Sequence, residues 1–396
     1  MKENINTLVN DELFLYKHKD EIMKLVGKYF KSKKYFNPFD LMQYDCQYLM
    51  AYGEKSNGKT TGWQIIMCAI YVLFGARSYY LRFYEHDFAQ NNAKAIFGGL
   101  PVDLISDITN KKYDCVVEFQ HAFYFAKYDA KTGKYIKDKT PFCYRRSIYT
   151  MGSSFKNPDV KLIMYDEFIR SDGIQITSEV LKVMTAFSTL KRESIEMQIV
   201  MCANTWDRNS KYFKEMGLKH VRFQEQGTID VYNLAKIQDA MLKIACYYCD
   251  SPANKDKKSD IYFAFNNPKL RTITSGDWCS DYYPKYTRFI KPKDVELKYF
   301  ILNDDLLFTC KVVLNDLGET FTYISLYNEK IEEPLNPEED IVYSFDKDNA
   351  LPNWFKNVLL IVYPFQKTIV SYYRENKIFY ESNIVGDCIK EYLSRC

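Results

Sequence analysis

The stretch Ala51-Tyr52-Gly53-Glu54-Lys55-Ser56-Asn57-Gly58-Lys59-Thr60-Thr61 contains the pattern G-x-x-x-x-G-K-[ST], directly behind the apolar run 48–50. Glycines at both ends of such a loop let the backbone turn so that its N–H groups point inward, where they can bind nucleotide phosphates. The apolar run 63–76 that follows predicts a buried helix whose N-terminus faces those phosphates. The pattern therefore predicts a strand, a phosphate-binding loop and a helix.

Each position of this loop has an expected role. Lys59 is expected to reach the β- and γ-phosphates of ATP, and the Thr60 hydroxyl to bind Mg²⁺. A glycine-rich turn unrelated to nucleotides is the alternative reading. The residues expected to bind the nucleotide are Gly53, Lys55, Ser56, Asn57, Gly58, Lys59, Thr60 and Thr61.

A second motif lies about a hundred residues further on. The apolar run 160–165 ends in the adjacent carboxylates Asp166 and Glu167. Two neighbouring carboxylates repel each other, and a nearby cation offsets this repulsion. Mg²⁺ would be that cation. We expect Asp166 to hold the metal ion and Glu167 to orient or deprotonate the attacking water. By itself the pattern would more often be a strand that runs into a solvated turn; its distance from the phosphate-binding loop favours the metal-binding role.

A third apolar run, 199–203, ends in Asn204 and Thr205. In motor ATPases that have an inserted strand beside the strand of the phosphate-binding loop, a polar residue at this place lies next to the γ-phosphate. Asn204 is therefore the expected sensor of that phosphate. A buried strand that ends in an Asn-Thr turn is the alternative.

Together these motifs resemble one known family. Tyr35-Phe36-Asn37-Pro38, Tyr44-Asp45, the phosphate-binding loop, Tyr80-Leu81-Arg82-Phe83-Tyr84, Lys156-Asn157-Pro158-Asp159-Val160 and Tyr165-Asp166-Glu167-Phe168-Ile169-Arg170 have the order and spacing found in the DNA-packaging (encapsidation) ATPases of small podoviruses with protein-primed genomes. The resemblance covers residues 35 to about 225 well and the remainder in outline.

The resemblance implies a reduced large terminase: a ring-forming, ATP-driven motor that moves double-stranded DNA into a prohead. The implied partners are the DNA, the portal (connector) protein and the prohead, with five subunits expected in the ring; whether a packaging RNA takes part stays open. The implied location is the host cytoplasm, with a transient stay at the portal vertex. Ring motors also need a cation from the neighbouring subunit at the γ-phosphate. The candidates for it are Lys191 and Arg192, while Lys55 is a candidate within the same subunit.

Composition fits a large globular protein with room for two domains. The chain has 396 residues, 47% of them hydrophobic and 27% charged, and a net charge of +3. Because the bulk charge is small, nucleic-acid binding would require a local basic face. The longest apolar run, 65–74, is too short to span a bilayer, and we expect no membrane partner. The 11 Cys are scattered, and we expect the lone pair Cys246 and Cys249 to pack in a helix, with zinc or redox chemistry as the alternative.

Alternation of strands and helices predicts an α/β fold, a three-layer P-loop motor ATPase domain of the additional-strand, catalytic-glutamate type, followed by a small α+β ribonuclease-H-like domain. We expect a helical arm at 1–33, the ATPase domain at 34–225, a helical linker at 226–262 and a vestigial nuclease-like domain at 263–396. Strands are expected at 47–52, 78–84, 160–165, 197–203 and 219–223, with an inserted hairpin at 114–150 and a helix at 229–248.

The C-terminal domain is not expected to cut DNA. Runs 306–314, 321–327 and 341–343 predict antiparallel strands, followed by helices at 353–374 and 384–394. Two-metal nucleases place an Asp on their first strand, whereas the expected first strand offers Thr309 and Lys311. The isolated Asp346, Asp348 and Asp387 do not form a convincing set.

Two further functions remain as alternatives. One is a terminase with an active nuclease, which would need a complete set of C-terminal acids. The other is a different P-loop translocase or helicase of nucleic acid, which is disfavoured because the chain has a single ATPase core. A binding module that merely keeps the loop would leave the acid pair and Asn204 without a role.

Overall fold

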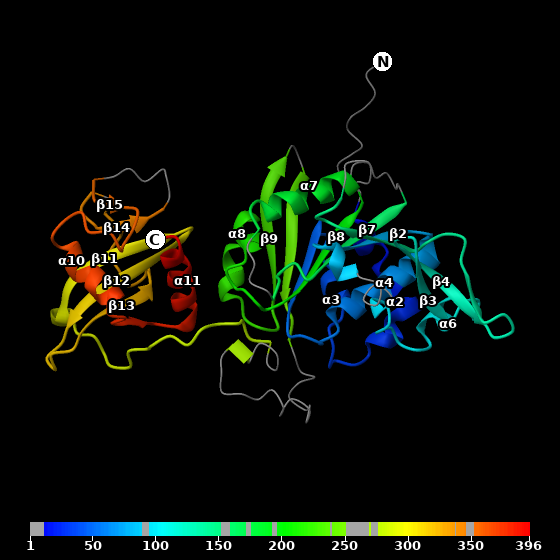
Figure 1. The fold of residues 1–396 in the computed structure, drawn as a ribbon, viewed down its shortest axis with the longest axis horizontal. Coiled ribbons are helices and arrows are strands. Elements are labelled where there is room, and N and C mark those ends of the chain that lie inside the picture. Colours follow the sequence, from blue (N-terminus) through cyan, green and yellow to red (C-terminus); the bar gives the residue numbers. More distant parts are fainter. Residues whose placement is uncertain are drawn as a thin grey trace, which may run out of the picture. The chain divides into compact units, whose positions relative to one another are not determined.

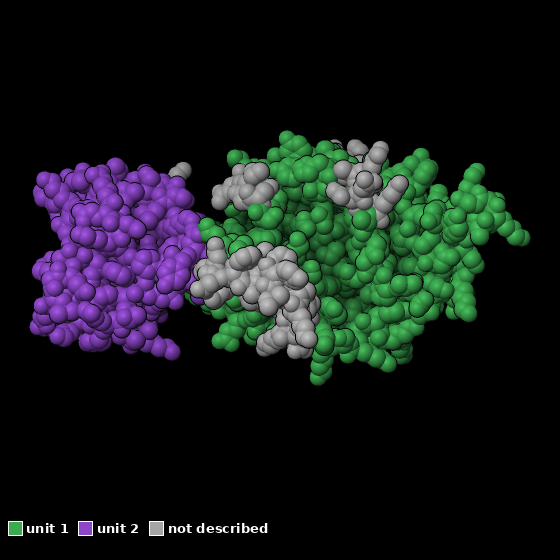
Figure 2. Space-filling model, turned by 60° about the horizontal axis from the view of Figure 1, so that its bottom comes forward, with its two compact units in different colours: residues 1–279 green, residues 280–396 purple. Residues whose placement is uncertain are grey.

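A computed structural model describes residues 12–88, 95–151, 159–171, 176–191, 196–237, 240–250, 269–270, 276–336, 338–345 and 352–396. The chain divides into two compact units, Met1–Cys279 and Ser280–Cys396, coloured green and purple in Figure 2. Among these described residues, no helix is long and apolar enough to cross a membrane.

Unit 1 is built on a ten-stranded sheet with the order β3-β4-β6-β2-β7-β8-β1-β10-β9, and β5 pairs with β4 (Figure 1). The pairs from β6 through β2, β7, β8 and β1 to β10 are all parallel, whereas β9, β3, β4 and β5 join by antiparallel pairs. The strands are β1 (Tyr48–Gly53), β2 (Arg77–Arg82), β3 (Cys115–Phe119), β4 (Ala122–Asp129), β5 (Lys134–Lys137), β6 (Cys143–Ser147), β7 (Val160–Asp166), β8 (Gln198–Asn204), β9 (Ile229–Ile237) and β10 (Ala240–Tyr248).

Helices cover both faces of this sheet, and its central strands are therefore buried on both sides. Along β7, Leu162 and Met164 belong to one apolar core and Ile163 and Tyr165 to the other. Residues of α2, α4 and α6 complete the first core, and residues of α7 and α8 the second. The α-helices are α1 (Phe14–Lys17), α2 (Lys19–Val26), α3 (Phe39–Met42), α4 (Lys59–Phe74), α6 (Leu104–Ile108), α7 (Glu179–Lys191) and α8 (Lys211–Glu215), and the 3₁₀ helices are η2 (Gly27–Phe30), η3 (Glu85–Phe88) and η4 (Lys219–Phe223). The predicted three-layer α/β domain is confirmed.

The described part of the N-terminal segment, from residue 12, is packed into unit 1. Leu15 and Ile22 are fully buried in the same core as α4. The Leu15 N–H also donates to Gln198 Oε1 at 2.6 Å, next to the start of β8. Helices α1 and α2 are therefore part of the core of unit 1.

Two predicted elements beyond residue 218 are wrong. Residues 219–223 form the 3₁₀ helix η4, and the expected helix 229–248 is the antiparallel pair β9 and β10. Strand β10 lies beside β1, with Tyr48 opposite Ile244 and Tyr52 opposite Tyr248. A strand buried on both faces lacks the alternation that identifies strands in a sequence. The predicted helical linker at 226–262 is therefore a strand pair of unit 1 as far as residue 248, and residues 251–268 lie outside the described ones.

Unit 2 contains a mixed sheet with the order β15-β14-β11-β12-β13-β16, packed against α10 and α11. An antiparallel run β11-β12-β13 is followed by β14, which adds in parallel to the free edge of β11. This arrangement agrees with the expected ribonuclease-H-like class. The elements are η7 (Pro292–Asp294, 3₁₀), β11 (Val295–Asn303), β12 (Leu306–Leu314), β13 (Thr320–Leu326), β14 (Val342–Ser344), β15 (Trp354–Phe355), α10 (Gln366–Arg374), β16 (Ile378–Tyr380) and α11 (Asn383–Ser394).

The first strand of unit 2 was assigned wrongly from the sequence. It is β11, whereas Thr309 and Lys311 lie on β12. Strand β11 was missed because its outward positions Glu296 and Lys298 follow a run of Lys and Pro that reads as a loop. The expected helix at 353–374 is helical only from Gln366, and the residues before it include the short strand β15.

Candidate nucleotide-binding site

The phosphate-binding loop joins the end of β1 to the first turn of α4. Gly53 has φ +153° and Gly58 has φ +89°, and α4 begins at Lys59. A Cβ at Gly53 would come within 3.2 Å of the Cys249 backbone oxygen, next to the end of β10. Both glycines are therefore required by the backbone, and the loop places the N-terminus of a 16-residue helix at the carboxyl edge of the sheet.

Lys59 lies inside this loop with its ammonium group pointing at loop oxygens. It is 5% exposed and donates to Glu54 O at 2.6 Å, Asn57 Oδ1 at 3.1 Å and Gly53 O at 3.3 Å. Burial lowers the pKa of the Lys59 ammonium from its ordinary value. The three acceptors hold the lysine at the mouth of the loop, where a phosphate would offer it stronger, charged acceptors.

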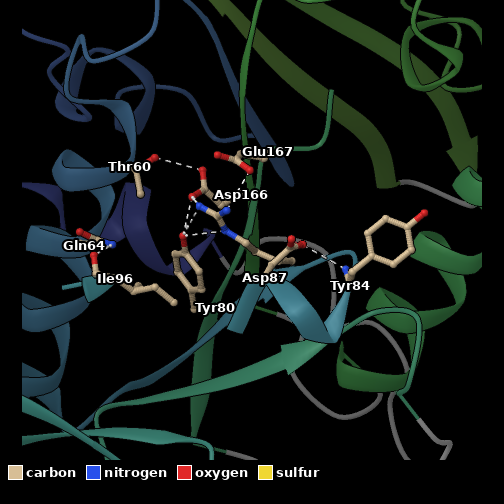
Figure 3. A network of polar contacts seen from close by, with 9 residues as sticks. Thr60, Gln64, Tyr80, Tyr84, Asp87, Ile96, Asp166 and Glu167 are labelled. Atoms are coloured by element: carbon tan, nitrogen blue, oxygen red, sulfur yellow. Dashed lines mark hydrogen bonds and ion pairs between the residues drawn. The ribbon is translucent and has the colours of Figure 1, made fainter. Parts of the chain in front are cut away.

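The first acid of the predicted pair meets the loop directly. Asp166 ends β7, is 2% exposed, and accepts a hydrogen bond from the Thr60 hydroxyl at 3.0 Å. Its second oxygen accepts from the Tyr80 hydroxyl at 2.5 Å and from Arg82 at 3.0 Å (Figure 3). The structure thus brings together Thr60 and Asp166, which the sequence predicted as the two metal ligands.

Glu167 points a second carboxylate to the same place from a strained backbone. Its φ is +60°, in the left-handed region, which costs a non-glycine residue roughly 1–3 kcal/mol. Its Oε2 accepts from Arg82 Nη1 at 2.8 Å, and its side chain is 55% exposed. Partial burial raises the pKa of the Glu167 carboxyl from its ordinary value, although Arg82 opposes this effect. The turn at Glu167 separates the exposed acid from the buried one.

Arg82 and Tyr80 are site residues whose roles sequence reasoning missed. Both come from β2, which pairs in parallel with β7 so that Leu81 lies opposite Tyr165. Arg82 therefore ends its strand beside Asp166 and forms ion pairs with both acids. The available signal was that two parallel strands end at one edge, the first in an Arg and the second in two acids.

The expected sensor residue lies on the strand between the two motifs. Strand β8 separates β7 from β1, as predicted for the inserted strand, and Asn204 lies opposite Gly53 of the loop. The next residue, Thr205, is fully buried, and its hydroxyl donates to Gly276 O at 2.9 Å. Gly276 has φ +70°, and a Cβ there would lie 3.0 Å from the Glu54 backbone nitrogen. The segment at 276 therefore packs against both the loop and the end of β8.

Lys191, the candidate trans-acting cation that the structure describes, does not lie in this cluster. Lys191 is the last residue of α7, shortly before the start of β8, whereas the phosphate-binding loop lies where the parallel strands end. Burial lowers the pKa of the Lys191 ammonium. Arg192 lies outside the described residues. Lys55 is exposed within the loop.

The residues present fit a hydrated Mg²⁺ bound together with phosphates. The two candidate ligand oxygens, Thr60 Oγ1 and Asp166 Oδ1, are 3.0 Å apart. Among the described residues, no group of three or more His, Cys, Asp or Glu could hold a metal ion by itself. Mg²⁺ commonly uses one or two protein oxygens and takes its remaining ligands from water and phosphate. A cavity of about 470 Å³ lies beside these oxygens, lined by Thr60, Tyr80, Arg82, His86, Asp87, Ala95 and Ile96.

The Cys246 and Cys249 pair belongs to the backbone support of the loop. Cys246 lies in β10, both thiols are buried, and the Cys249 N–H donates to Tyr52 O at 2.8 Å. The expectation that they pack in the interior holds, but in and beside a strand instead of a helix.

Solved structures share this fold. A chain of the bacteriophage Phi-29 viral genome packaging motor assembly superposes with a TM-score of 0.52 at 16% identity, covering 92% of this chain and 99% of that chain. The Phi-28 gp11 DNA packaging motor gives 0.47 at 14% identity, covering 92% and 99%, and the HK97 bacteriophage large terminase gives 0.38 at 12% identity, covering 77% and 67%.

No protein-family model and no curated protein matches the sequence. The likeness to the Phi-29 motor chain extends over both units and shows the fold. The predicted resemblance to packaging ATPases is confirmed at that level.

Proposed function

We propose that this chain, which has the fold of a viral packaging-motor ATPase, hydrolyses ATP to move double-stranded DNA into a prohead. The observation that carries the proposal is the hydrogen bond between Thr60 and Asp166 at the carboxyl edge of the sheet. Glu167 follows Asp166, and the buried Lys59 precedes Thr60. Phosphoryl transfer needs this combination of a phosphate-binding loop, a metal ligand and a group that orients water.

The residues divide the chemistry among themselves. Lys59 and the loop N–H groups bind the phosphates, and Thr60 and Asp166 would hold Mg²⁺, which supplies positive charge at the phosphate oxygens. Glu167 orients or deprotonates the attacking water. Asn204 lies opposite Gly53 on the neighbouring strand. It responds to loss of the γ-phosphate and couples that loss to a movement of β8.

Packaging, as distinct from another use of ATP, is supported by the extent of the likeness. The Phi-29 packaging-motor chain matches both units of this chain over 92% of its length. We propose the same kind of assembly here: a ring of identical subunits, five in number, docked on a portal protein at the vertex of a prohead in the host cytoplasm. A packaging RNA is a further candidate partner.

A cation from the neighbouring subunit completes the site in this proposal, and Lys191 and Arg192 are the candidates. Lys191 ends α7, away from its own phosphate-binding loop, which is compatible with action on a neighbouring subunit's nucleotide. The test mixes Arg192→Ala subunits with Lys59→Ala subunits. Turnover restored at mixed interfaces supports action of Arg192 in trans, whereas no rescue at any mixing ratio, with assembly verified, assigns Arg192 to the surface.

The nuclease alternative receives no support from the described residues of unit 2. They contain no cluster of three acids, and Asp387 accepts a hydrogen bond from the Ser280 hydroxyl at 2.7 Å. Asp346 and Asp348 lie outside the described residues. Incubating the full chain with supercoiled plasmid and Mn²⁺ tests this point, because nicking that disappears in Asp387→Ala or Asp346→Ala would restore the terminase reading.

The experiment that tests the main proposal measures ATP turnover alone, with double-stranded DNA, and with DNA and proheads. We expect stimulation by DNA and proheads together, and protection of the DNA from added nuclease as it enters the prohead. Lys59→Ala is the matched inactive control. Turnover that is indifferent to DNA and proheads would contradict the packaging function while leaving the ATPase assignment intact.

A further inference from the structure

Positive charge is concentrated in one insertion of unit 1. Residues 111–147, which contain β3 to β6, carry nine Lys and Arg and four Asp and Glu, a net charge of +5. The whole chain carries +3, so the rest of the protein is slightly acidic. This insertion therefore supplies a local excess of positive charge of the kind that nucleic-acid binding requires.

Three of the four acids of the insertion accept hydrogen bonds from side chains of unit 1 that are not lysines. Glu118 accepts from Arg145 at 3.0 Å, Asp129 accepts from the Thr132 hydroxyl at 2.8 Å, and Asp138 accepts from the Tyr71 hydroxyl at 3.1 Å. Every lysine of the insertion is exposed: Lys111, Lys112, Lys127, Lys131, Lys134, Lys137 and Lys139.

The lysines are held on a formed hairpin. Strands β4 and β5 pair in antiparallel fashion around the turn at Gly133, and the hairpin stands away from the helices at one end of the sheet (Figure 1). Lys131 and Lys134 flank the turn, and Lys139 follows β5. The lysines are thus exposed on and beside a two-stranded hairpin, where they can contact a negatively charged surface.

The aromatic residues beside them favour phosphate contact over base stacking. The Lys137 ammonium lies 4.1 Å from the ring centre of Tyr124 and 5.0 Å from that of Phe119. The rings of Tyr128 and Tyr135 contact each other at a tilt of 58°, with centres 5.2 Å apart. Stacking of unpaired bases needs open ring faces, and here the rings contact each other or a lysine. The ammonium groups are left as the contacting groups.

We propose that the hairpin β4–β5, with the lysines of its insertion, binds the phosphate backbone of double-stranded DNA. The choice of DNA as the polyanion rests on the proposed function. Phosphate contacts carry no sequence information, which is what a motor that must move any sequence requires.

The test compares two triple variants of the full chain with equal loss of charge. The hairpin variant replaces the lysines nearest the turn, away from the rings, and the control replaces three exposed lysines of unit 2. The substitutions are Lys131→Gln, Lys134→Gln and Lys139→Gln in the hairpin variant, and Lys330→Gln, Lys356→Gln and Lys367→Gln in the control. Binding to a random-sequence DNA duplex is measured by fluorescence anisotropy between 50 and 200 mM salt, with melting temperature and DNA-free ATP turnover as checks of folding.

The expected result is a change in salt dependence. Each lost phosphate contact lowers the slope of log affinity against log salt by about 0.9, so three contacts make the parent lose roughly 40-fold more affinity than the hairpin variant over this range. The control variant keeps the parent slope. An unchanged slope in the hairpin variant, or equal changes in both variants, overturns the inference.

A third arm uses a double-stranded RNA of the same length. Loss of RNA binding with DNA binding intact would overturn the assignment to DNA. Failure of the parent chain to bind any duplex would instead count against the proposed packaging function, so the two outcomes can be told apart.

Discussion

Replacing Arg82 by glutamine removes the cation that joins the two acids of the candidate site. Arg82 contacts Asp166 Oδ2 at 3.0 Å and Glu167 Oε2 at 2.8 Å. Asp166 keeps its hydrogen bonds from Thr60 and Tyr80. The variant therefore leaves a buried carboxylate that is still hydrogen-bonded but has lost its charge partner.

The expected cost follows from the exposure of each partner. A hydrogen bond to a charged group is worth roughly 1.5–3 kcal/mol, and this applies to Asp166 because its side chain is 3% exposed. The contact with the exposed Glu167 adds about 0–1 kcal/mol. A total of about 1.5–4 kcal/mol lowers the melting temperature of a domain of this size by roughly 3–16 °C.

The assay is thermal unfolding with and without Mg²⁺ and a non-hydrolysable ATP analogue. We expect most of the deficit of Arg82→Gln to disappear when the metal and nucleotide are bound, because Mg²⁺ then gives Asp166 the positive charge that Arg82 supplied. The control is Arg145→Gln, which loses contacts to Glu118 at 3.0 Å and Glu85 at 3.1 Å. Its deficit should not depend on nucleotide.

The result that would refute this reasoning is a deficit of the same size with and without Mg²⁺ and nucleotide. Arg82 would then be a structural ion-pair partner, and Asp166 would not be the metal ligand. Loss of folding in Arg82→Gln can be separated from this outcome with Arg82→Lys, which keeps the charge.

Three further predictions concern the same site. Lys59→Ala should abolish ATP turnover while the protein stays folded, because the ammonium contacts loop oxygens and not the core; turnover near the parent rate would contradict the phosphate-binding loop. Glu167→Gln should still bind Mg²⁺ and ATP through Asp166 but turn over about 10²–10⁴-fold more slowly. The parent rate should also fall on acidification with a midpoint above the ordinary glutamate pKa, since the pKa of Glu167 is raised and its base form is required, and Glu167→Gln should lack this limb. Gly276→Ala should weaken nucleotide binding, measured by calorimetry, because its Cβ would lie 3.0 Å from Glu54 N in the loop; unchanged affinity would show that the loop does not depend on this contact.

The sequence alone determined the parts of the site that adjoin one another along the chain. A phosphate-binding loop needs glycines at fixed positions, and Gly53 and Gly58 do adopt the positive φ that the pattern implies. The strand that ends in Asp166 and the strand that ends in Asn204 were also predicted, because short apolar runs bounded by polar residues identify buried strands. Local spacing carried this information, and it was sufficient for the three-layer fold.

Only the tertiary structure decided which strands lie side by side. Strand β10 reads as a helix in the sequence, because a strand between two neighbours and two helical layers is apolar on both faces. Arg82 and Asp166 are far apart in the chain, and only the parallel pairing of β2 with β7 makes them an ion pair. Contacts of this kind depend on the order of strands in the sheet, which is set by the packing of the whole domain. The spacing of residues within one motif therefore cannot predict them.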